Sequence, residues 1–106
     1  MLGVNKIIFN HYDVITLFVD KGIIEYNNID RKISNDKLMD ILKNIVMITH
    51  NWKSEYIDLN TYDGVDWSLD IYYSDGEIQT YKGHASYPDN FNKLDNLFTN
   101  LLKEVL

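Results

Sequence analysis

Hydrophobic and polar side chains alternate along two stretches of the chain, residues 14–26 and residues 67–82. Such alternation predicts β-strands, because successive side chains of a strand point to opposite faces. Turn residues interrupt each stretch, Asp20-Lys21-Gly22 in the first and Asp75-Gly76 in the second. Glycine readily adopts the positive φ that a tight hairpin turn requires. The pattern therefore predicts two β-hairpins.

A helical pattern follows each hairpin. Apolar residues recur at the spacing of one helix face over residues 38–52 and again over residues 91–105. Ser34 or Asn35 is placed to cap the first helix with a side-chain oxygen. Pro88 lies just before the second helix or in its first turn, where the missing N–H costs nothing.

Together these elements predict an α+β fold: a two-layer sandwich in which an antiparallel sheet carries two helices on one face. The length of 106 residues corresponds to a single domain, residues 1–106. Residues 4–10 are expected to add a strand or short helix, and residues 56–59 an edge strand. The halves also resemble each other. This indicates a duplicated β-β-α unit over residues 12–52 and 66–106, although generic amphipathic patterning would give the same match.

The sheet face turned away from the helices is the first candidate binding surface. If every second side chain of the hairpins packs on the helices, the side chains between them face solvent. This open face is expected to carry Thr16, Phe18, Glu25, Asp70, Tyr72, Glu77, Gln79 and Tyr81. Aromatic rings among carboxylates suit contact with another macromolecule. The alternative is an ordinary solvated face rich in good strand formers.

Acidic residues are concentrated in one part of the chain. The net charge is −6, and the segment from Ser54 to Tyr81 contains seven acidic residues and no Lys or Arg. Such a cluster repels nucleic acid and attracts basic protein surfaces. Asp63 and Asp75 each precede a glycine, so we expect them to form turns.

The other five acids are candidate contact residues. The full set of predicted partner-binding residues is Glu55, Asp58, Asp66, Asp70, Glu77, Phe18, Tyr72 and Tyr81. One interpretation is a nucleic-acid mimic that occupies the basic groove of a protein. The other is that turn-forming acids simply collect where turns collect.

Catalytic and cofactor-binding motifs are scarce. The chain has no cysteine, its three histidines are widely spaced, and its five glycines form no phosphate-binding loop. His84 and Ser86 lie close together, but their flanking residues lack the G-x-S-x-G elbow of a serine nucleophile. Arg31 is the single arginine, which leaves little for bidentate recognition of phosphate or guanine. We therefore expect no enzymatic activity, no cofactor and no direct nucleic-acid binding.

A metal site and a membrane location are also not expected. The acids and amides from Asp58 to Asp66 resemble a calcium loop only superficially, because Asp63 stands where the loop requires glycine. No apolar run approaches the ~18 residues of a membrane span. Polar residues 10–13 interrupt any signal peptide. The prediction is a cytoplasmic protein.

The second half carries a pattern of fold-defining residues. Asp63 to Gly76 reads D-G-x-x-W-x-L-x-I-x-Y-x-D-G, and Gly83 and then Tyr87-Pro88-x-Asn90-Phe91 follow. The segment resembles small uncharacterised proteins of low-GC Gram-positive bacteria and of their phages and mobile elements. The resemblance covers about the last 45 residues and implies an architecture but no activity.

Composition supports the same kind of source. Asn, Ile, Lys and Tyr are abundant while Gly, Ala, Arg and Pro are scarce, which indicates an AT-rich gene. The functional expectation is a small acidic, non-enzymatic inhibitor from a phage or mobile element that binds a basic, nucleic-acid-handling effector. Its sharpest form is an anti-CRISPR-like protein that blocks a host defence nuclease complex. The alternatives are an immunity or antitoxin protein that neutralises a basic toxin, and a homo-oligomeric structural domain.

Overall fold

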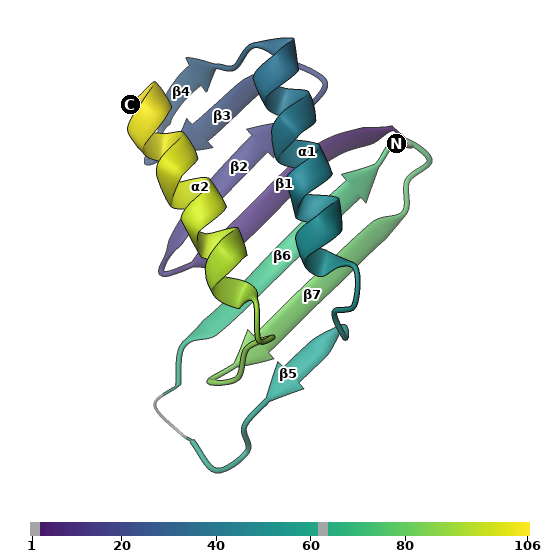
Figure 1. The fold of residues 1–106 in the computed structure, drawn as a ribbon, viewed down its shortest axis with the longest axis vertical. Coiled ribbons are helices and arrows are strands. Elements are labelled where there is room, and N and C mark those ends of the chain that lie inside the picture. The colour runs from purple at the N-terminus through teal and green to yellow at the C-terminus, as the bar shows by residue number, and fades with distance from the viewer. Residues whose placement is uncertain (1–2, 62–63) are drawn as a thin grey trace.

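The computed structural model describes residues 3–61 and 64–106, and within them seven strands form one sheet with two helices on one of its faces (Figure 1). The elements are β1 (Val4–His11), β2 (Asp13–Phe18), β3 (Ile23–Tyr26), β4 (Ile29–Lys32), α1 (Asn35–Thr49), β5 (Glu55–Ile57), β6 (Asp66–Tyr73), β7 (Ile78–His84) and α2 (Phe91–Val105). The strand order is β4-β3-β2-β1-β6-β7-β5, and only the β5–β7 pair is parallel among these strands. The predicted two-layer α+β architecture is confirmed.

Both predicted hairpins are present. In the first, Leu17 on β2 lies opposite Ile24 on β3, and in the second, Leu69 on β6 lies opposite Tyr81 on β7. Gly22 and Gly76 have φ values of +63° and +92°, the left-handed region that favours glycine. The two hairpins therefore end in turns that the sequence marks with glycine.

Strand β1 joins the two hairpins. It pairs antiparallel with β2 on one side and with β6 on the other, so Ile7 lies between Leu17 and Ile71. The sequence left the choice between strand and short helix open here, because Ile7, Ile8 and Phe9 form a continuous apolar run. The structure makes the segment the central strand. The expected edge strand near residues 56–59 is also present, as β5.

The sequence patterns did not indicate β4. All four of its residues are exposed, so the strand has no alternation of buried and exposed positions to detect. The signal available was the Asn27-Asn28 pair, whose φ values of 50° and 63° form the turn between β3 and β4. Asparagine tolerates this left-handed conformation better than most residues.

The helices begin where their capping residues predict. Ser34 Oγ accepts a hydrogen bond of 3.2 Å from the backbone N–H of Lys37 at the start of α1, so Ser34 rather than Asn35 is the cap. Pro88 lies ahead of α2, and its carbonyl accepts a hydrogen bond from the N–H of Phe91. The arrangement of strands and helices does not show whether the two halves arose by duplication, so the duplicated β-β-α unit remains a prediction.

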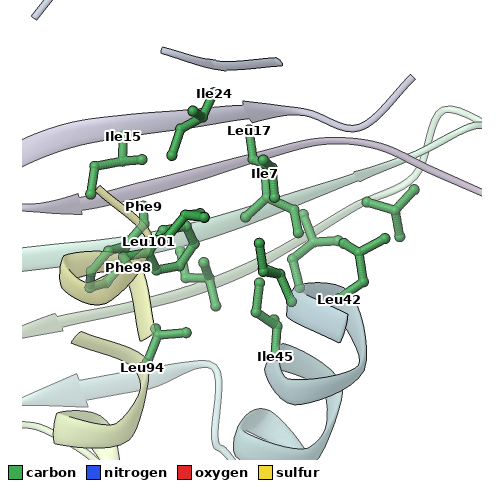
Figure 2. Close-up of a cluster of buried hydrophobic side chains, with 14 of the residues drawn as sticks. Ile7, Phe9, Ile15, Leu17, Ile24, Leu42, Ile45, Leu94, Phe98 and Leu101 are labelled. Carbon is green, nitrogen blue, oxygen red and sulfur yellow. The ribbon is translucent and has the colours of Figure 1, made fainter. Parts of the chain in front are cut away.

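The core lies between the sheet and the helices. Figure 2 shows strand side chains pointing toward apolar residues of α1 and α2. The labelled members are Ile7, Phe9, Ile15, Leu17 and Ile24 from the strands, Leu42 and Ile45 from α1, and Leu94, Phe98 and Leu101 from α2. Burial of these side chains is the main favourable contribution to folding.

Asn90 connects the two helices. Its Nδ2 donates a hydrogen bond of 2.9 Å to the carbonyl of Ile48 in the last turn of α1. Its Oδ1 accepts a hydrogen bond of 2.6 Å from the indole N–H of Trp52. The same residue is the N-cap of α2, although its side chain does not cap that helix. One amide therefore holds the end of α1 against the start of α2.

Trp67 fills the space beneath these helix ends. Its side chain is 2% exposed, and its Nε1 donates a hydrogen bond of 2.9 Å to the carbonyl of Ser86. The indole passes over Gly83, where a Cβ would lie 2.2 Å from Nε1. The ring packs under the Tyr87-Pro88 loop, with 6.2 Å between its centroid and that of Tyr87.

We expect Gly83→Ala to lower the free energy of unfolding by about 2–4 kcal/mol, because the new methyl group displaces the Trp67 indole and disturbs its hydrogen bond. Gly76→Ala is the matched control. No atom lies within 4 Å of its Cβ position, so its cost is limited to the positive φ, about 1–2 kcal/mol. Urea unfolding followed by fluorescence measures both. Equal destabilisation would contradict the role assigned to Gly83.

Candidate functional site

The helices leave one face of the sheet uncovered, and the strand register arranges its side chains in rows. The first row, here called the apolar-basic row, combines aliphatic, aromatic and lysine side chains. From β4 to β7 it reads Lys32, Ile23, Phe18, Lys6, Tyr72 and Ile78. Residues that pair across neighbouring strands share a face, so this row is continuous across the sheet.

Lysines lie over the aromatic rings of this row. Lys6 Nζ is 4.4 Å from the ring centroid of Tyr72, and Lys21 Nζ is 5.5 Å from that of Phe18. Both distances suit cation–π attraction. Together with Glu77, these residues line a shallow hollow of about 330 Å³ at one end of the face. The hollow presents ring surface between positive and negative groups.

A second row, here called the acidic row, runs beside the first. From β4 to β7 it reads Asp30, Glu25, Thr16, Ile8, Asp70 and Thr80. Asp70 Oδ1 accepts a hydrogen bond of 2.7 Å from the hydroxyl of Thr80. Basic and acidic side chains thus lie in adjacent rows on one surface.

His84 lies at the opposite end of the open face, between two acceptors. Its Nδ1 is 2.5 Å from Asp66 Oδ1, and its Nε2 is 2.8 Å from the carbonyl oxygen of Thr61. Neither partner has a proton to donate when Asp66 is ionised, so the doubly protonated imidazolium satisfies both contacts. The Asp66 hydrogen bond, followed by that to Thr61, raises the pKa of His84 above its ordinary value. Both ring nitrogens are occupied, so His84 has none free to activate Ser86.

Asp58 stabilises the turn that follows β5. Its Oδ1 accepts a hydrogen bond from the N–H of Asn60, and its Oδ2 accepts one from the hydroxyl of Thr61. The Asn60 hydrogen bond, followed by that of Thr61, lowers the pKa of the Asp58 carboxyl. This arrangement matches the turn-forming role that the sequence offered as the alternative to partner contact.

Most of the predicted contact residues share the open face. Phe18, Tyr72 and Asp70 lie in its rows, while Asp66 and Glu55 lie on the same face near β5. Glu77 lines the hollow beside Tyr72. Both carboxylate oxygens of Asp58, in contrast, accept hydrogen bonds within its own turn.

The placement of Tyr81 was wrong. Tyr81 lies opposite the buried Leu69, and its ring centroid is 5.6 Å from that of Trp52, so it faces the helices. Gln79 is on the same side, opposite Ile71. The prediction assumed a two-residue Asp75-Gly76 turn, whereas Tyr73 and Glu77 close a longer loop, with Tyr73 N–H bonded to the Glu77 carbonyl. One extra loop residue reverses every side chain of the returning strand.

The acidic cluster of the sequence is not a continuous acidic surface. Lys82 lies between Ser68 and Glu55 on the open face, and Lys6 lies between the strands that carry Phe18 and Tyr72. Neighbours in a sheet come from distant parts of the chain, so a segment without lysine still acquires lysine neighbours. Asp63 lies outside the described residues.

Other kinds of site have little support in residues 3–61 and 64–106. No three His, Asp or Glu side chains are grouped there so that they could hold a metal ion. Neither described helix is long and apolar enough to cross a membrane. A scan against protein-family models and searches of curated proteins and of solved structures each found no match.

The His84 contacts predict a pH-dependent stability. Because the folded-state pKa of His84 is raised, its stabilisation is complete below about pH 6.5 and is lost as the pH rises through the raised value. We expect the free energy of unfolding to fall as the pH rises from about 6.5 through the raised pKa of His84. The variant His84→Gln should lack the decrease that His84 causes. His50→Gln, at the exposed end of α1, is the control and should retain it. Identical pH profiles for wild type and His84→Gln would refute the assignment.

Proposed function

We propose that this chain is a non-enzymatic protein-binding domain and that the open sheet face is its contact surface. The observation that supports the proposal is the apolar-basic row, in which Phe18 and Tyr72 stand between Ile23 and Ile78 on a face opposite both helices. Aromatic and aliphatic side chains surrounded by polar groups are typical of the centre of a protein interface.

The acidic row and the net charge support a basic protein as the partner. The acidic row contributes Asp30, Glu25 and Asp70 beside the lysines of the same face, and the chain as a whole carries a net charge of −6. These charges oppose nucleic acid and favour a partner with lysines or arginines around an apolar patch. We therefore propose a nucleic-acid-handling effector as the partner, which the domain inhibits by covering its basic groove.

The inhibitor proposal includes an anti-CRISPR-like protein as its sharpest form and an immunity or antitoxin protein as its alternative. Both would use the same acidic and aromatic surface, so the identity of the captured partner separates them. A second copy of the chain is the other candidate occupant of the face. Size-exclusion chromatography with light scattering distinguishes that outcome, because a homodimer would form without any added protein.

The aromatic residues of the face give the first test. We expect Phe18→Ser with Tyr72→Ser to abolish capture of a basic protein that the wild type retains from a low-GC bacterial lysate, because the interface loses its apolar centre. The control is Met39→Ser with Val46→Ser on α1, whose side chains are 48% and 49% exposed. Circular dichroism checks that both double variants fold. If both variants captured the partner equally, the open face would not be the contact surface.

The acidic row gives the second test. We expect Glu25→Gln with Asp70→Asn to slow association with the captured partner by about tenfold at low salt, because electrostatic steering is lost. The wild-type rate should itself fall as ionic strength rises, since exposed charges are screened within about 8 Å at physiological salt. Asp36→Asn with Asp40→Asn on α1 removes the same charge from another surface. Stopped-flow fluorescence measures the rates, and a salt-independent rate would rule out steering by these acids.

A further inference from the structure

A second concave surface lies on the helix side of the sheet, away from the open face. It is a hollow of about 370 Å³ where the end of α1 meets the loop before α2. Trp52, Tyr56 and Tyr87 line it, together with Asp89 and the last turn of α1. The volume is in the range of small-molecule sites.

The three lining aromatic residues each pack near the same buried side chain. Their ring centroids lie 5.7 Å (Trp52), 6.2 Å (Tyr56) and 6.2 Å (Tyr87) from that of the buried Trp67. The Trp52 indole N–H is bound to Asn90, and the Tyr56 hydroxyl accepts a hydrogen bond from the N–H of Lys53. Since these two polar groups are already engaged within the protein, the rings of Trp52 and Tyr56 contribute to the apolar part of a lining that is otherwise mostly polar.

Negative charge converges on the same hollow. Asp89 contributes a carboxylate from the loop before α2. The last turn of α1 carries no Lys or Arg, although its Ile48 and Thr49 carbonyls accept hydrogen bonds from Asn90 and from the N–H of Trp52. His50, at the end of α1, also lines the hollow.

We propose that this hollow binds an organic ammonium group, of the quaternary type found in choline and in trimethylated lysine. Aromatic faces attract such cations, which are too large and too weakly hydrated to need a full set of hydrogen bonds. Asp89 and the end of α1 add electrostatic attraction from one side. The site lies on the other side of the sheet from Phe18 and Tyr72, so the proposal does not depend on the open face.

The test compares two probes of nearly equal shape. Choline carries the charge, and 3,3-dimethyl-1-butanol has a carbon in place of the nitrogen. We expect choline to shift the Trp52 indole N–H signal in a ¹⁵N–¹H spectrum with a Kd of about 0.1–10 mM, and the neutral analogue to bind at least tenfold more weakly. The affinity for a trimethyl-lysine peptide, measured against its unmodified form and against choline, then shows whether the hollow prefers a modified lysine side chain or a free small molecule.

Variants locate the binding to this hollow. Asp89→Asn should weaken choline binding about tenfold, and Tyr87→Leu at least fivefold, whereas Tyr87→Phe keeps the ring and should bind like wild type. Tyr87 is 38% exposed, which makes these substitutions compatible with folding. Phe18→Ser on the open face is the control and should leave the affinity unchanged. The proposal is overturned if choline and its neutral analogue bind equally, if neither binds at 50 mM, or if Asp89→Asn and Tyr87→Leu retain wild-type affinity.

Discussion

The packing of Trp67 over Gly83 is the contact around which β5, the loop before α2 and the adjoining helix ends are arranged. Phe91 of α2 packs on this indole with 4.8 Å between ring centroids, and Trp52, Tyr56 and Tyr87 pack around it. These rings come from the segment that follows α1, from β5, from the loop before α2 and from α2 itself. The indole N–H must also be satisfied when the ring is buried, and Ser86 does so through its carbonyl. The Trp67 side chain therefore contacts both the residue Trp52 that follows α1 and the first residue of α2.

Much of the architecture could be predicted from residue patterns alone. The alternation in β2 and β6, the helix faces that contain Leu42 and Leu94, and the turn glycines Gly22 and Gly76 are local signals, and each corresponds to an observed element. Strand β4 was missed because its burial does not alternate. An alternating sequence pattern arises when one face of a strand is buried. A strand such as β4, which is exposed throughout, can therefore be recognised only from the turn that precedes it.

The candidate site could be predicted only in part. Phe18, Tyr72 and Asp70 were placed correctly because each lies on the first strand of its hairpin, where the alternation is unambiguous. Tyr81 lies on the returning strand, so its face depended on the length of the loop between Tyr73 and Glu77. The charge of the open face could not be predicted from the segment Ser54 to Tyr81 either. Lys6 and Lys82 lie on this face but belong to other parts of the chain. The aromatic hollow was missed for a similar reason, because Tyr56 and Tyr87 come together only through Trp67.

The central position of β1 has a consequence for how the chain folds. Ile7 pairs with Leu17, a near neighbour in sequence, but also with Ile71, which the other half of the chain supplies. Until β6 is available, one edge of β1 has unpaired N–H and C=O groups beside buried-type side chains, a surface prone to association with other chains. The long separation of β1 and β6 also raises the contact order, which slows folding relative to a protein built from local pairs. The first half therefore cannot complete its sheet alone, and the two halves are expected to fold in one cooperative step.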